Sequence, residues 1–185
     1  MPTISPKRWP RTAKLLLPAL MICAVALALP TGASAGGGIG TGSSTETTPG
    51  SKAKLVNGKA VAPADAPQEV QDVIAAANKI RNKPYVYGGG HGSFKDKGYD
   101  CSGAVSYALH GGGFLKAPLD SSGLGKWGSN KKGQWISVYG APSHAYMVVA
   151  GLRFDTSMTP GDGPGWSKSM RSTPESYKVR HPRGF

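Results

Sequence analysis

The sequence predicts an α+β domain in which helices come first and an antiparallel β-sheet follows. Apolar residues recur at helical spacing early in the domain, whereas later segments are short and rich in aromatic and β-branched residues. Turn-forming residues separate these later segments, which favours antiparallel pairing of neighbours. Helices are expected within residues 65–84 and 101–110, and strands within residues 134–139, 144–150, 152–157 and 176–182.

The first expected helix has an apolar face and plausible signals at both ends. Asp65 and Gln68 have the spacing of a capping box, and Pro84 ends the segment. The residues that share its apolar face are Val70, Val73, Ile74, Ala77 and Ile80.

The second expected helix begins at Cys101, and Asp100 is placed to cap it by accepting backbone N–H bonds. A glycine run from residue 111 ends it. Gly103 lies inside this helix at a cost of about 1 kcal/mol relative to alanine. Such a glycine indicates close packing against a neighbouring backbone.

The N-terminus has the pattern of an export signal. A basic lead precedes the apolar run of residues 15–30, and Ala33-Ser34-Ala35 offers a small-residue cleavage site. A retained membrane anchor is the alternative, but the run is shorter than the ~20 residues a spanning helix needs, and Pro18 interrupts it. We expect residues 1–35 to be a secretory signal peptide and residues 36–62, rich in Gly, Ser and Thr, to be a flexible linker. Residues 63–185 then form one compact domain.

The charge of the chain suggests its partners. There are 22 Lys and Arg residues against 10 Asp and Glu, and residues 1–35 hold four of the basic side chains and no acid. A basic exported protein suits a polyanionic surface such as a cell wall, although solubility alone could explain the charge. Export and the scattered placement of the basic residues argue against nucleic acid as a partner.

A single cysteine remains once the signal peptide is removed. Cys23 lies within the signal, so Cys101 has no partner in the chain although exported proteins form disulfides readily. An odd thiol suggests intermolecular pairing or a reactive sulfur, and a buried inert cysteine is the alternative. Position favours reactivity, because a helix N-terminus or a neighbouring imidazolium lowers a thiol pKa from about 8.5.

The histidine best placed to activate Cys101 is His144. It starts an expected strand and is therefore held on a rigid element, whereas His91 lies in a Gly-rich loop, His110 lies nine residues along the helix of the thiol, and His181 lies near the C-terminus. A structural histidine is the alternative for an isolated residue of this kind.

A tight turn at residues 150–151 would place Asp155 on the same face of the sheet as His144. A carboxylate there would orient the imidazole and raise its pKa. The alternative for Asp155 is a solvated residue at the end of a strand.

Three stretches, "PYVYGGG" (84–90), "GYDCSGAVSYAL" (98–109) and "SHAYMVVAGLRFD" (143–155), together resemble the NlpC-type cell-wall cysteine peptidases. That family has a papain-like minimal fold, with N-terminal helices packed on an antiparallel sheet and the nucleophile at a helix N-terminus. The loop before Cys101 is longer than is usual in the family, and the segment before His144 departs from the family pattern.

The resemblance implies roles for individual residues. Cys101 matches the nucleophile, His144 the general base, and Tyr85 a tyrosine whose hydroxyl lies near the oxyanion site. The third polar residue of the family varies; Asp155 fits if the hairpin is one residue tighter than usual, and Thr156 is the substitute. Tyr87 occupies a position that we expect to pack against the domain.

The resemblance also implies a function: hydrolysis of peptidoglycan stem peptides between D-γ-glutamate and diaminopimelate or lysine, through a thioester. We expect a secreted monomer at the cell wall, without a cofactor, metal, nucleic-acid partner or stable membrane anchor. Short paired ligand spacings for zinc are missing from the sequence. The alternatives are an N-acetylmuramoyl amidase or acyltransferase on the same fold, and a noncatalytic wall-binding module.

Overall fold

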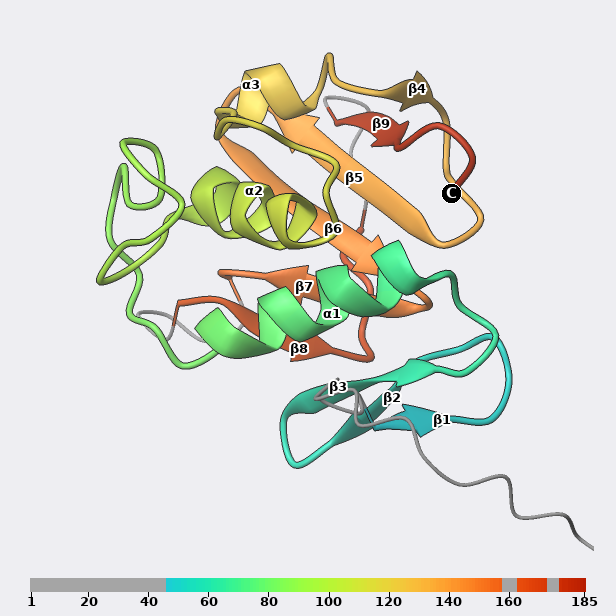
Figure 1. The fold of residues 1–185 in the computed structure, drawn as a ribbon. Helices are drawn as coiled ribbons and strands as arrows, with labels where there is room; N and C mark the ends of the chain where they lie inside the picture. The colour runs from blue at the N-terminus through green and yellow to red at the C-terminus, as the bar shows by residue number, and fades with distance from the viewer. Residues whose placement is uncertain (1–45, 158–162, 173–176) are drawn as a thin grey trace, which may run out of the picture. The chain divides into compact units, whose positions relative to one another are not determined.

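The computed structural model describes residues 46–157, 163–172 and 177–185. The helices are α1 (Gln68–Ile80), α2 (Cys101–Gly111) and α3 (Ser121–Leu124), and the strands are β1 (Thr47–Thr48), β2 (Lys54–Val56), β3 (Lys59–Pro63), β4 (Ser129–Asn130), β5 (Ile136–Ala141), β6 (His144–Val149), β7 (Leu152–Asp155), β8 (Gly165–Ser167) and β9 (Lys178–His181). The predicted α+β class is confirmed: α1 and α2 pack together, and α2 contacts the sheet at β6 and β7 (Figure 1).

The main sheet has the strand order β4-β9-β5-β6-β7-β8. Every neighbouring pair within it is antiparallel, as the turn signals predicted. The predicted two-residue turn joins β6 to β7: Val149 pairs with Leu152, and both Ala150 and Gly151 have positive φ. Positive φ at both turn positions matches the right-handed twist of the strands, which fixes the register of this hairpin.

The strand order forces the chain to return across the sheet. β8 lies at one edge, whereas the next strand, β9, lies between β4 and β5. Arg171 and Tyr177 lie between these two strands in the sequence, at described positions beside the middle of the sheet. Both residues contact side chains of β6 or β7 there.

The two helices that the sequence predicted, α1 and α2, have the expected apolar faces, but only one of the two expected N-terminal caps is present. The face of α1 from Val70 to Ile80 is buried. Its N-cap is Pro67, without a side-chain hydrogen bond, so the capping box of Asp65 and Gln68 is wrong. Residues 63–66 form a turn in which the Ala66 N–H donates to the Pro63 carbonyl. Asp65 therefore lies in this turn, and α1 begins only at Gln68. Asp100 caps α2 as predicted, since its Oδ1 accepts the Gly103 N–H at 2.8 Å.

The linker predicted for residues 36–62 is wrong for the part that the structure describes. Residues 54–63 form the hairpin of β2 and β3, which turns at Asn57-Gly58 with positive φ at both positions. Residues 60–62 are buried. The Asn78 side chain on α1 completes the pairing by donating to the Ala60 carbonyl at 2.7 Å and accepting its N–H at 3.0 Å. The signal peptide predicted for residues 1–35 lies outside the described residues and stays a prediction.

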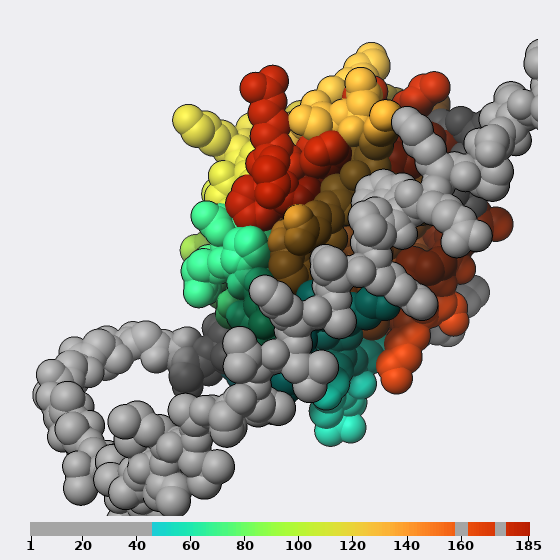
Figure 2. Space-filling view, turned by 90° about the vertical axis from the view of Figure 1, so that its right-hand side faces the viewer, coloured from blue at the N-terminus to red at the C-terminus, as the bar shows by residue number. Residues whose placement is uncertain are grey.

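The C-terminal residues close one end of the core. Phe185 packs edge-on against Phe114, with ring centroids 4.9 Å apart. Figure 2 shows these last residues, in red, on the surface beside the yellow residues that follow α2. Among the described residues, none of the helices meets the length and hydropathy of a membrane-spanning segment.

Candidate active site

Cys101 lies at the first position of α2, and the surrounding backbone holds that position tightly. The Asp100 carboxylate caps the helix through Oδ1 and accepts the Gly88 N–H through Oδ2 at 3.1 Å. The predicted close packing at Gly103 is present: a Cβ there would lie 2.0 Å from the Gly89 carbonyl oxygen. The Gly-rich loop and the first turn of α2 therefore form one packed unit beneath the thiol.

His144 and Asp155 meet beside Cys101. His144 begins β6, Asp155 ends β7, and His144 Nε2 lies 2.9 Å from Asp155 Oδ1. The Asp155 side chain is 0 % exposed and that of His144 is 16 % exposed. The imidazole also makes a side-chain hydrogen bond with the Cys101 thiol. Since Nε2 faces Asp155, Nδ1 is the ring nitrogen left for the sulfur.

The substitute for Asp155 considered from the sequence does not share this arrangement. Within the described residues, the Thr156 hydroxyl is buried without a hydrogen-bond partner. The alternation of side chains along β7 thus directs Asp155, and not Thr156, to the histidine.

The charges of the three side chains stabilise one another. Burial raises the pKa of the Cys101 thiol, but the hydrogen bond from His144 and the Ala145 backbone N–H outweigh it, so the thiol pKa is lowered overall. Burial lowers the pKa of His144, but hydrogen bonds with Asp155 and Cys101 raise it to about 9. Burial raises the pKa of Asp155, but the donors His144 and Ser157 N–H lower it to about 2. The contacts of His144 therefore stabilise the thiolate form of Cys101 and the protonated form of the imidazole together.

Arg171 completes the group, and no pattern in the sequence predicted it. Its Nη1 donates to Asp155 Oδ2 at 3.1 Å and lies 3.2 Å from His144 Nε2. Its guanidinium also lies over the Tyr146 ring, 5.7 Å from the centroid. Arg171 belongs to the irregular connection between β8 and β9, where neither periodicity nor a motif marks a functional residue.

An open cleft of about 480 Å³ lies in front of the thiol. The residues that line it are Tyr85, Tyr87, Gly88, His91, Asp100, Cys101, Ser102, Asp120, Ser121, Ser122, Pro142 and Ser143. A parallel β-bridge between the backbones of Tyr85 and Tyr99 holds Tyr85 next to the segment that leads to Cys101. Burial, and then the charges of Cys101 and Asp100, raise the Tyr85 pKa, so its hydroxyl keeps its proton and can donate it to a hydrogen bond.

Two sequence expectations about this cleft need correction. Tyr87 was expected to pack against the domain but is 92 % exposed at the cleft. The Gly-rich loop was expected to position His91 poorly, yet His91 Nε2 lies 3.0 Å from Asp100 Oδ1 and 3.1 Å from Ser102 Oγ. His91 therefore belongs to the cleft wall.

The remaining histidines have structural partners. His110 stacks on Phe94 and its Nδ1 lies 2.8 Å from the Leu115 carbonyl oxygen. His181 Nδ1 lies 3.0 Å from the Lys131 carbonyl oxygen. Across the described ranges, no group of three His, Cys, Asp or Glu side chains could hold a metal ion.

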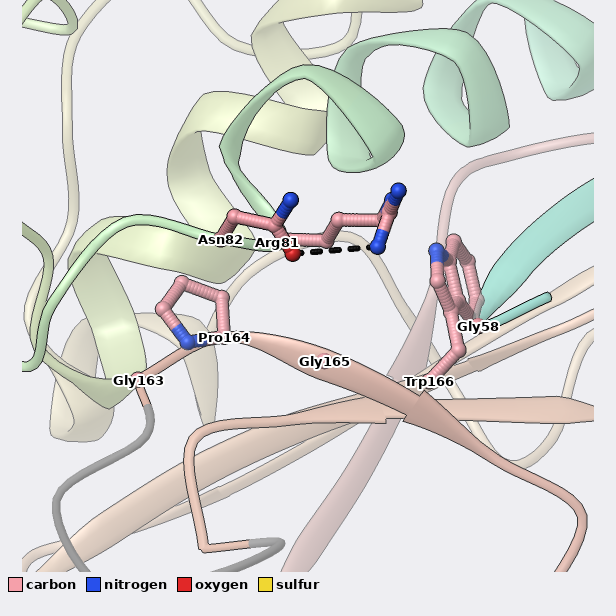
Figure 3. A pocket seen from close by; sticks show the side chains of 7 residues that line it. All are labelled: Gly58, Arg81, Asn82, Gly163, Pro164, Gly165 and Trp166. Atoms are coloured by element: carbon pink, nitrogen blue, oxygen red, sulfur yellow. Dashed lines mark hydrogen bonds between the residues drawn. The ribbon is translucent and has the colours of Figure 1, made fainter.

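A second cavity of about 450 Å³ contains none of the residues around Cys101. Figure 3 shows Arg81 and Asn82, joined by a 3.0 Å hydrogen bond, opposite Pro164 and Trp166. The Trp166 indole is largely buried and donates to Asn78. Gly163 at its rim packs on the backbone just before Tyr85, where a Cβ would lie 2.1 Å from the Lys83 carbonyl oxygen. Gly163 at the rim of this cavity thus packs against the backbone that leads into Tyr85.

Comparison with known proteins finds similarity only among solved structures. No family model and no curated protein matches the chain. The P60 domain from an antigen of M. avium subspecies paratuberculosis is similar at 22 % identity over 61 % of this chain and 94 % of that chain, with a TM-score of 0.48. The peptidoglycan hydrolase RipB from Mycobacterium tuberculosis is similar at 23 % identity over 61 % of this chain and 64 % of that chain, with a TM-score of 0.48.

A third similar structure comes from the same organism. It is RipD, described as a non-catalytic NlpC/p60 domain protein adapted to peptidoglycan binding, with 24 % identity over 62 % of this chain and 98 % of that chain and a TM-score of 0.46. The similar structures thus include one described as a hydrolase and one described as non-catalytic.

Proposed function

We propose that this chain is an exported cysteine peptidase that hydrolyses peptidoglycan stem peptides. The observation that supports the proposal is the continuous contact from Cys101 to His144 to Asp155 at the edge of an open cleft. A noncatalytic binding module has no need of a lowered thiol pKa beside a raised imidazole pKa. The resemblance to NlpC-type peptidases agrees with this chemistry.

The first half of the reaction forms a thioester. The Cys101 thiolate attacks the scissile carbonyl carbon, a C–S bond forms, and the carbonyl electrons move to oxygen. The Cys101 N–H, which has no partner inside its helix, and the Tyr85 hydroxyl donate to this oxyanion. The His144 imidazolium gives its proton to the leaving nitrogen as the C–N bond breaks.

The second half restores the enzyme. Neutral His144 takes a proton from water, and the resulting hydroxide attacks the thioester carbonyl. The C–S bond breaks, the acid product leaves, and the thiolate and imidazolium are formed again. Asp155 stays ionised throughout, because its pKa of about 2 is far below the working pH.

The substrate proposal rests on resemblance and on charge. The bond between D-γ-glutamate and diaminopimelate or lysine is the one that NlpC-type peptidases cut. The basic balance of the chain outside residues 1–35 favours association with a polyanionic wall. Release from the membrane as a free protein would follow from removal of residues 1–35, which N-terminal sequencing of the secreted protein tests directly.

Digestion of purified sacculi tests the enzymatic proposal. Mass spectrometry of products from wild type, Cys101→Ser and His144→Ala separates the possibilities. We expect truncated stems on the glycan with wild type only. Whole stem peptides released from the glycan would indicate an amidase instead. Intact sacculi in all three digests, with protein retained on the wall, would replace the peptidase with a binding module.

A further inference from the structure

The Asp155 carboxylate is held by more donors than a histidine-orienting residue needs. Oδ1 receives His144 Nε2 at 2.9 Å and the Ser157 N–H at 3.0 Å, while Oδ2 receives Arg171 Nη1 at 3.1 Å. Arg153 Nε is farther away, 3.7 Å from Oδ2. Each carboxylate oxygen thus has its own donors. Because Arg171 holds Oδ2, Oδ1 is kept facing His144.

Arg171 is anchored independently of Asp155. Its guanidinium lies over the Tyr146 ring, and the Tyr177 ring packs edge-on against the same ring at 5.4 Å. Arg171 follows β8 in the sequence, so it reaches the site from a different segment than His144 on β6 and Asp155 on β7. Its side chain is 32 % exposed, which leaves the charge only partly screened by water.

The contact between Arg171 and His144 defines a charge relationship. Nη1 lies 3.2 Å from Nε2. When Nε2 carries a hydrogen and donates it to Asp155, both atoms are donors, and no hydrogen bond can join them. Two cations then lie close together whenever His144 is protonated. The arginine opposes the stabilisation that Asp155 gives to the imidazolium, which keeps the proton transferable to a leaving amine.

We propose that Arg171 is a positioning residue of the candidate active site, which fixes Asp155 toward His144 and limits the stability of the imidazolium. This inference rests on the proposed peptidase function for its purpose but not for its geometry. The charged and titratable groups that face the Asp155–His144 pair are Cys101 from α2, Tyr146 from β6, Arg153 from β7, and Arg171 and Tyr177 from the connection to β9.

The test compares Arg171→Gln, Arg171→Lys and the control Lys168→Gln. Lys168 is an exposed cation three residues before Arg171, so its replacement removes the same charge away from the site. The rate of Cys101 alkylation by iodoacetamide is measured from pH 4 to 11. The alkaline inflection of that profile reports the loss of the His144 proton beside the thiolate.

We expect the inflection of Arg171→Gln to move up by about one pH unit, because a like charge beside the imidazolium has been removed. Arg171→Lys keeps the charge, so its inflection should stay within a few tenths of a pH unit of that of wild type. The inflection of Lys168→Gln should do the same. On sacculi, kcat of Arg171→Gln should fall about tenfold or more with little change in KM. An unmoved or downward-shifted inflection in a folded Arg171→Gln protein overturns the proposal.

A measurement on the wild type covers the case in which Arg171→Gln does not fold. The ¹⁵N NMR shifts of His144 above its inflection identify the neutral tautomer. The proposal requires hydrogen on Nε2, facing Asp155. Hydrogen on Nδ1 would leave Nε2 free to accept a hydrogen bond from Arg171, and it would overturn the proposal. Both readouts work without a substrate, so failure to digest sacculi would reject the peptidase function while the role of Arg171 is still decided.

Discussion

His144 Nε2 lies 2.9 Å from Asp155 Oδ1, and the two residues stand at the matching ends of neighbouring antiparallel strands. The tight turn at Ala150-Gly151 creates this relationship, since it sets the register in which the start of β6 meets the end of β7. A shift of one residue would turn Asp155 to the opposite face of the sheet. The site therefore depends on the turn at the opposite end of the β6–β7 hairpin.

Asp155→Asn should preserve the shape of the site but remove the charge that stabilises the imidazolium. We expect kcat to fall by about 10²-fold or more, which is the usual range for a disturbed general base. The pKa of His144 should drop below its present value of about 9, because the neutral amide no longer favours the protonated ring. The pH profile of hydrolysis measures both effects; an alkaline limb that stays in place would mean that Asp155 does not control His144.

Acid should destabilise the fold through the same carboxylate. The pKa of Asp155 is lowered from 3.8 to about 2, so its contribution to stability is complete above pH 3.8 and is lost as pH falls through 2. The shift corresponds to about 2 kcal/mol in the free energy of unfolding. Urea unfolding of wild type between pH 5 and 2 should show this loss. The free energy of unfolding of Asp155→Asn should change less with pH over this range. If the two proteins showed the same pH dependence, Asp155 would not be the source of the acid destabilisation.

Gly103→Ala should disturb the floor beneath the thiol. The added methyl group would lie 2.0 Å from the Gly89 carbonyl oxygen, a backbone atom that cannot easily move. We expect a loss of about 3 kcal/mol in the free energy of unfolding, together with slower alkylation of Cys101. Gly92→Ala is the matched control, because a Cβ there meets no atom within 4 Å. Equal stability of the two variants would refute the close packing of loop and helix.

Tyr85→Phe should affect the transition state and leave substrate binding nearly unchanged. The pKa of Tyr85 is raised by burial and by the charges of Cys101 and Asp100, so its hydroxyl remains a donor at neutral pH. Loss of one oxyanion donor should lower kcat by about 10²- to 10³-fold with little effect on KM. Steady-state kinetics on a soluble stem peptide measures the two separately. A rise in KM alone would assign Tyr85 to substrate binding.

Much of the fold could be predicted because its patterns are local. The apolar periods of α1 and α2, the alternating strands and the Ala150-Gly151 turn all follow from residues close together in the sequence. The β2–β3 hairpin also had a local signal, Asn57-Gly58, but the composition around it favoured a linker. Its stability depends on Asn78 and Trp166, which are distant in sequence.

The candidate site was only partly predictable for the same reason. Cys101, His144 and Asp155 lie on regular elements whose direction follows from periodicity. Arg171 lies after β8 and outside the regular elements, and β8, β4 and α3 are too short for a periodic pattern. The exposure of Tyr87 likewise depends on the path of the Gly-rich loop, which glycines leave open in the sequence.

The most direct test of the account is the rate of Cys101 alkylation by iodoacetamide at pH 6 in wild type and His144→Ala. An ordinary thiol with a pKa of about 8.5 is less than about 1 % ionised at this pH. We predict that wild type reacts at nearly its pH 8.5 rate, because the imidazolium holds the sulfur as a thiolate, and that His144→Ala reacts about 10²-fold more slowly. Equal, slow rates in both proteins would contradict a thiolate–imidazolium pair at this site.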